Sequence, residues 1–97
     1  MADLLTDEQI TTALNGLPHW QRDGDSVVRT AELAGFPQAI EVVNRVAQHA
    51  EAAQHHPDID IRWRTVTFRL STHSDGGITQ KDIDLATQID VEIGAAP

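Results

Sequence analysis

The sequence predicts an α+β fold in which a four-stranded antiparallel sheet is covered on one face by three helices. Segments with apolar residues at helical spacing alternate with segments whose apolar residues fall at every second position. The strand-like segments come in closely linked pairs, which favours antiparallel pairing. The 97-residue chain has no internal repeat, low-complexity stretch or Pro/Gly-rich linker. We therefore expect one domain, residues 1–97, in the order helix, two strands, helix, two strands, helix.

The first predicted helix begins after Thr6. Thr6 and Gln9 have the spacing of a capping box, in which each side chain bonds the backbone N–H of the other residue. Asn15-Gly16, followed by Pro18, is typical of a helix end. The apolar residues of this stretch recur at helical spacing: Ile10, Ala13, Leu14 and Leu17.

Two strands are expected next, over residues 20–22 and 26–33. The second is rich in β-branched residues, which fit a pleated sheet: Val27, Val28 and Thr30. Asp23-Gly24-Asp25 lies between the two strands and is typical of a tight turn.

A second helix is predicted to open at Gly35-Phe36-Pro37, because proline is tolerated in the first turn of a helix. It must stop near His55, since Pro57 restricts the residue before it to extended conformations. Its apolar stripe is expected to face the core and consists of Ile40, Val43, Ala47 and Ala50, widened by Val46 and Ala53.

The remaining chain is expected to contain a second strand pair and a last helix. Apolar residues alternate first at odd and then at even positions: Ile59, Ile61 and Trp63, then Val66, Phe68 and Leu70. The change at Arg64-Thr65 requires a tight hairpin or a bulge, because a strand cannot change faces without one. Thr79 and Asp82 have the capping-box spacing of a helix that carries four apolar residues inward: Leu85, Ala86, Ile89 and Ile93.

Composition excludes several classes of function. Fifteen acidic against seven basic residues give a net charge of −8, which argues against general nucleic-acid binding. The N-terminal residues lack a basic region, and no apolar run approaches the ~20 residues that span a bilayer, so we expect a cytoplasmic protein without membrane contacts. The absence of cysteine excludes a thiolate nucleophile and a Cys-type zinc site.

Four candidate functional residues stand at the ends of predicted elements: His55, His56, His73 and Asp82. Element ends allow a side chain to leave the core and still be held by rigid supports. Histidine has an unperturbed pKa of about 6.5, so two imidazoles can serve as acid and base near neutral pH.

Structural explanations exist for the same residues. A His pair at a helix end interacts favourably with the helix dipole, and Asp82 is explained as a capping residue. His73 can be a solvated loop residue. A three-His metal site is weakened because consecutive residues in extended chain point in opposite directions, which separates His55 from His56.

Three segments together resemble the pterin-4a-carbinolamine dehydratase family: Glu51–Asp58 with its His-His-Pro-Asp run, Ser71–His73, and Gly77–Asp82. The resemblance implies an α+β fold with three helices on one side of a four-stranded antiparallel sheet, and a homodimer or homotetramer. It also implies loss of water from 4a-hydroxytetrahydropterin to give quinonoid dihydropterin. That reaction recycles tetrahydrobiopterin for an aromatic amino-acid hydroxylase and needs no metal or other cofactor.

The same resemblance implies roles for particular residues. His55 and His73 would be the acid and base, in an unassigned order, and Asp82 would hold or polarise a catalytic group. Three residues would bind or shape the pocket for the pterin: Glu51, His56 and Pro57. The alternative function is that of a non-catalytic dimerisation or assembly cofactor, which binds a protein partner on the same scaffold.

Overall fold

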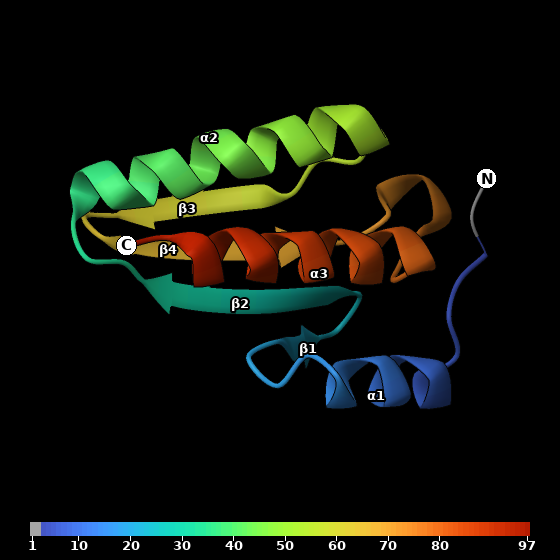
Figure 1. The fold of residues 1–97 in the computed structure, drawn as a ribbon. Helices are drawn as coiled ribbons and strands as arrows, with labels where there is room; N and C mark the ends of the chain where they lie inside the picture. The colour runs from blue at the N-terminus through green and yellow to red at the C-terminus, as the bar shows by residue number, and fades with distance from the viewer. Residues whose placement is uncertain (1–2) are drawn as a thin grey trace.

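The structure is a computed structural model that describes residues 3–97 (Figure 1). Its elements are α1 (Asp7–Asn15), β1 (Gln21–Asp23), β2 (Ser26–Glu32), α2 (Phe36–Ala53), β3 (Asp58–Arg62), β4 (Thr65–Leu70), the short 3₁₀ helix η1 (His73–Asp75) and α3 (Gln80–Ala95). The predicted order of helices and strands is confirmed.

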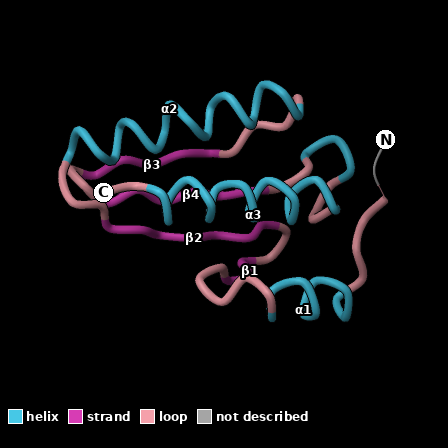
Figure 2. The backbone as a smooth tube through the Cα atoms, viewed as in Figure 1, coloured by secondary structure: helices cyan, strands magenta, loops and turns pink. Residues whose placement is uncertain are grey.

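The four strands form one antiparallel sheet in the order β1-β2-β4-β3. The central pair joins β2 to β4, from Val27 opposite Leu70 to Glu32 opposite Thr65. Alternate side chains of β4 are buried on one face, where they meet the buried faces of the helices: Val66, Phe68 and Leu70. Figure 2 shows α3 running along the middle of the sheet over β4, with α2 beside β3 and α1 beside β1. The predicted α+β fold is therefore confirmed.

The change of apolar parity between β3 and β4 is a tight hairpin, as predicted. Arg62 pairs with Thr65, which leaves Trp63 and Arg64 as the loop. Trp63 does not continue the inward-facing alternation expected from the sequence. Its backbone φ is 53°, its side chain is at the turn, and the residue is 70% exposed. The Arg64 guanidinium lies over the indole, 4.9 Å from its centroid, and stabilises this position by a cation–π contact.

The buried stripe of α2 is shifted from the predicted one. The buried residues are Ala39, Val42, Val46 and Ala50. Val46 and Ala50 are buried and half-buried Val43 packs against the core, as predicted. Ala47 and Ala53 are exposed and Ile40 is only half-buried, so the prediction is wrong for these three residues. The helix carries two overlapping apolar stripes, and periodicity alone does not decide which one faces the sheet. The stripe that does so has alanine at both ends, which permits close approach.

The N-terminal segment is tied to the start of α3. The predicted capping box of α1 is present, with the Gln9 N–H 3.1 Å from Thr6 Oγ1 and the Thr6 N–H 2.8 Å from Gln9 Oε1. Just before it, the Leu5 N–H donates to the Ile78 carbonyl at 2.9 Å. Within residues 3–97, no helix is both long enough and apolar enough to cross a bilayer.

The helices α2 and α3 pack side by side and run in opposite directions (Figure 1). The C-terminal end of α2 therefore lies next to the N-terminal end of α3. Two helix ends of opposite partial charge meet at this point of the fold.

Two glycine substitutions test the backbone of the first hairpin. Gly24 has φ +60° and Gly94 lies in the last turn of α3, and a Cβ at either position meets nothing within 4 Å. We expect Gly24→Ala to lower the free energy of unfolding by about 1 kcal/mol, because only its backbone conformation opposes a side chain. Gly94→Ala, the matched control, should leave stability unchanged or raise it by about 0.5 kcal/mol. Urea denaturation measures both, and an equal loss in the two variants would contradict the left-handed turn.

Candidate active site

The end of α2 sets the position of His55. Gln54 adopts the left-handed conformation, with φ 51° and ψ 44°. The His55 N–H then donates to the Ala50 carbonyl at 3.0 Å, and the Gln54 N–H donates to the Glu51 carbonyl at 3.2 Å. These bonds close the helix in the manner of a Schellman motif without the usual glycine. The chain turns sharply at this point, and His55 is 8% exposed.

The start of α3 sets the position of Asp82. Thr79 is the N-cap residue, and its backbone N–H donates to Asp82 Oδ2 at 2.9 Å, as the predicted capping box requires. The Lys81 N–H donates to Thr79 Oγ1 at 3.2 Å. Asp82 is completely buried. A carboxylate in this position is favoured by the positive end of the helix dipole.

The structure brings His55 and Asp82 into direct contact. His55 Nε2 lies 2.5 Å from Asp82 Oδ1, and the two side chains are 10% and 0% exposed. Burial strengthens such a bond because water does not compete for either partner. Sequence reasoning named both residues, and this contact gives Asp82 a second partner beyond its helix cap.

Thr72 completes the surroundings of Asp82. Its hydroxyl donates to Asp82 Oδ2 at 2.8 Å and lies 2.8 Å from the Thr79 hydroxyl. Sequence reasoning assigned no role to Thr72. The alternation of the strand could have identified it. Phe68 and Leu70 point inward, and Thr72 is the next residue expected on the same face. A polar side chain on an apolar face indicates a buried hydrogen-bond partner.

The second predicted His lies in a different pair. His56 Nε2 is hydrogen-bonded to Glu51 Oε2, and the two side chains are 60% and 71% exposed. Pro57 follows and is half-buried. His56 and Glu51 thus form a solvent-facing pair one residue away from the buried one.

His73 lies at the margin of the buried network. It is exposed and begins η1, directly after Thr72. His73 is linked to His55 indirectly. Its neighbour Thr72 donates a hydrogen bond to Asp82, and Asp82 is in turn bonded to His55.

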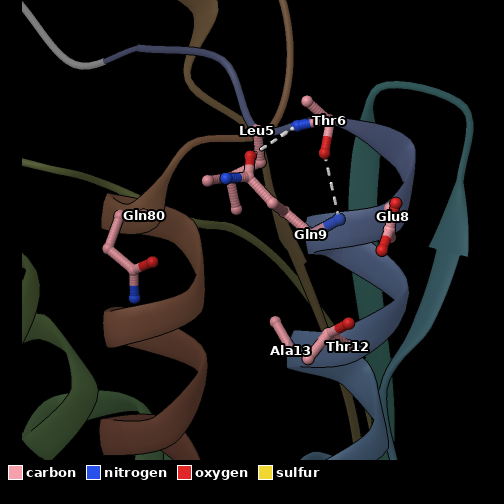
Figure 3. A pocket seen from close by; sticks show the side chains of 7 residues that line it. All are labelled: Leu5, Thr6, Glu8, Gln9, Thr12, Ala13 and Gln80. Carbon is pink, nitrogen blue, oxygen red and sulfur yellow. Dashed lines mark hydrogen bonds between the residues drawn. The ribbon is translucent and has the colours of Figure 1, made fainter.

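Two grooves of the surface are lined by other residues. Figure 3 shows the groove between α1 and the first turn of α3, lined by Leu5, Thr6, Glu8, Gln9, Thr12, Ala13 and Gln80. A second groove is lined by Arg45, Gln48, His49, Ala52 and Glu92. There His49 Nε2 lies 2.7 Å from Glu92 Oε2. Across residues 3–97, no three His, Asp or Glu side chains are grouped to hold a metal ion.

Substitution of Asp82 tests the buried network. Asp82→Ala leaves three buried donors without their acceptor, so we expect the free energy of unfolding to fall by about 2–4 kcal/mol. Asp84→Ala is the control, because Asp84 is exposed on the same helix and, among residues 3–97, its side chain accepts a hydrogen bond only from Gln80. Its effect should be about 0.5 kcal/mol or less. Thermal and urea unfolding measure both, and similar losses would show that the buried bonds contribute little.

Relatives with known names resemble this chain over nearly its whole length. A protein of Nocardia farcinica is 66% identical over 88 residues, which cover 91% of this chain and 93% of the relative. A protein of Mycobacteroides abscessus is 62% identical over 91 residues, covering 94% and 97%. Both are provisionally named pterin-4-alpha-carbinolamine dehydratase.

A solved structure shares the fold. The crystal structure of a transcriptional coactivator/pterin dehydratase from Brucella melitensis superposes with a TM-score of 0.92 at 29% identity, covering 95% of this chain and 100% of the other. The profile of one family, described as pterin 4 alpha carbinolamine dehydratase, matches residues 3–91. The chain therefore belongs to the pterin-4a-carbinolamine dehydratase family.

Proposed function

We propose that this protein removes water from a pterin 4a-carbinolamine by acid–base catalysis with His55 and His73. The observation that carries the proposal is the buried contact between His55 Nε2 and Asp82 Oδ1 at 2.5 Å. A histidine oriented by a buried carboxylate is a typical arrangement for moving protons. The family and the names of the relatives supply the reaction class.

The chemistry needs two proton transfers and no change of oxidation state. Hydroxide is a poor leaving group, so the 4a-hydroxyl leaves as water after it receives a proton. A ring nitrogen loses a proton at the same time, and its electron pair forms the C=N bond of the quinonoid dihydropterin. One imidazolium and one imidazole can perform these steps, each contributing roughly 10²–10⁴-fold. The substrate is 4a-hydroxytetrahydropterin, with tetrahydrobiopterin as the recycled form.

The exposed residues beside the buried pair would bind the pterin. His56 and Glu51 together present a donor and an acceptor to solvent, as a heterocycle with several ring nitrogens requires. Pro57 holds the chain extended directly after them and shapes the edge of the site. Within this proposal the protein works in the cytoplasm as a homodimer or homotetramer, in the same pathway as an aromatic amino-acid hydroxylase.

Single histidine variants test the assignment. We expect His55→Ala and His73→Ala each to lower the rate of carbinolamine dehydration by about 10²–10⁴-fold, because each removes one proton carrier. His19→Ala is the matched control and should keep the wild-type rate, since His19 is exposed in the loop between α1 and β1. The measurement is the disappearance of freshly generated 4a-hydroxytetrahydropterin above the rate in buffer. A wild-type protein that does no better than buffer would refute the enzymatic function.

The alternative is a protein that binds a macromolecular partner on the same scaffold. The Brucella melitensis protein is described both as a coactivator and as a pterin dehydratase. A pull-down with the wild type and the His55, His56, His73 triple alanine variant separates the two functions. Recovery of one stoichiometric partner with both proteins, together with an inactive wild type, would favour the partner-binding function.

A further inference from the structure

The hydrogen bonds around Asp82 indicate whether its carboxyl is ionised and which atoms of its neighbours carry protons. Oδ2 accepts from the Thr72 hydroxyl and from the Thr79 N–H, and Oδ1 faces His55 Nε2. Oδ2 accepts from two donors and so carries no proton, and the positive end of α3 favours the ionised form of the whole carboxyl. The network is complete when Asp82 is ionised and accepts from every side.

The two threonine hydroxyls then have fixed directions. The Thr72 proton points to Asp82, so the remaining contact between hydroxyls must be donated by Thr79 to Thr72. The Thr79 oxygen is free to accept the Lys81 N–H, which lies 3.2 Å away. Each hydroxyl donates once and accepts once, and all donation runs toward the carboxylate.

The same accounting of donors and acceptors indicates which ring nitrogen of His55 carries the proton. An ionised Asp82 only accepts, so Nε2 of His55 must carry a proton in both the neutral and the charged imidazole. The other ring nitrogen, Nδ1, is the atom that can gain and lose a proton. Within residues 3–97 the one buried side-chain nitrogen or oxygen without a partner is Arg29 Nε. Nδ1 of His55 is therefore not fully enclosed by the protein.

We infer that Thr72 is a positioning residue that anchors Asp82, keeps the proton of His55 on Nε2 and leaves Nδ1 as the atom that exchanges protons. This inference rests on the proposed dehydratase function for its catalytic consequence, whereas the placement of the protons rests on the hydrogen bonds of Asp82 and on its position at the start of α3. Thr72 is 3% exposed and acts on the reaction only through Asp82. It joins the end of β4 to the site, whereas Asp82 belongs to α3 and His55 follows α2.

The first test measures the protons of His55 without substrate. Nitrogen-15 NMR of the histidine-labelled wild type should show His55 with a protonated Nε2, whose proton resonates far downfield and exchanges slowly. At high pH Nδ1 should be the unprotonated nitrogen. A proton on Nδ1 in the neutral ring would overturn the inference, and this measurement needs no variant to fold.

The second test uses the isosteric variant Thr72→Val, which removes only the hydroxyl. The downfield signal should be lost, and kcat for the carbinolamine should fall about 10- to 100-fold with KM changed less than about twofold. Thr72→Ser restores the hydroxyl and should restore both the signal and most of kcat. Thr67→Val is the control, because Thr67 shares a similar hydroxyl pair with Thr30, at 2.9 Å, on the exposed face of the sheet.

The outcomes separate this inference from the proposed function. An inactive wild type with the Nε2 proton in place would refute the dehydratase and support the proton placement. A Thr72→Val protein that keeps both the signal and kcat would overturn the role of Thr72. So would a loss that Thr72→Ser fails to restore, because that result indicates packing of the methyl group rather than hydrogen bonding.

Discussion

The buried carboxylate of Asp82 is the constraint on which the site depends. A charge without solvent is stable in a protein only when donors surround it, and here they come from three parts of the chain. The Thr79 N–H closes the start of α3, the Thr72 hydroxyl comes from the end of β4, and His55 comes from the end of α2. One residue therefore caps a helix and also fixes the imidazole beside it. In the proposed function, the stability of the fold and proton transfer by His55 depend on the same bonds.

The antiparallel packing of α2 and α3 makes this convergence possible. The two helices lie on one face of the sheet, and the Ala-containing stripe of α2 allows a close approach. The negative end of α2 meets the positive end of α3, which favours an anionic Asp82 beside a proton-carrying His55. The exposed pair of His56 and Glu51 then stands next to the buried pair, where a ligand from solvent can reach it.

Local patterns explain most of what was predicted correctly about the fold. Both capping boxes and the hairpin at Arg64 are encoded within a few neighbouring residues, so the sequence is sufficient to find them. The stripe of α2 was misassigned because its two apolar faces compete, and the sheet selects between them. Trp63 was misplaced because an alternating pattern does not show where a strand ends. The error in α2 concerns its contact with the sheet, and the error at Trp63 concerns the point where a strand ends.

The sequence by itself determined the order of the elements, the family pattern and the identity of the candidate residues. Only the tertiary structure decided that Asp82 meets His55 across 27 positions of sequence, that the Thr72 hydroxyl donates to Asp82, and that His56 pairs with Glu51. The reason is physical. Caps and turns depend on hydrogen bonds between near neighbours, which spacing in the chain reveals. The partners of a buried carboxylate depend on which helix ends and strand ends are brought together when the core forms.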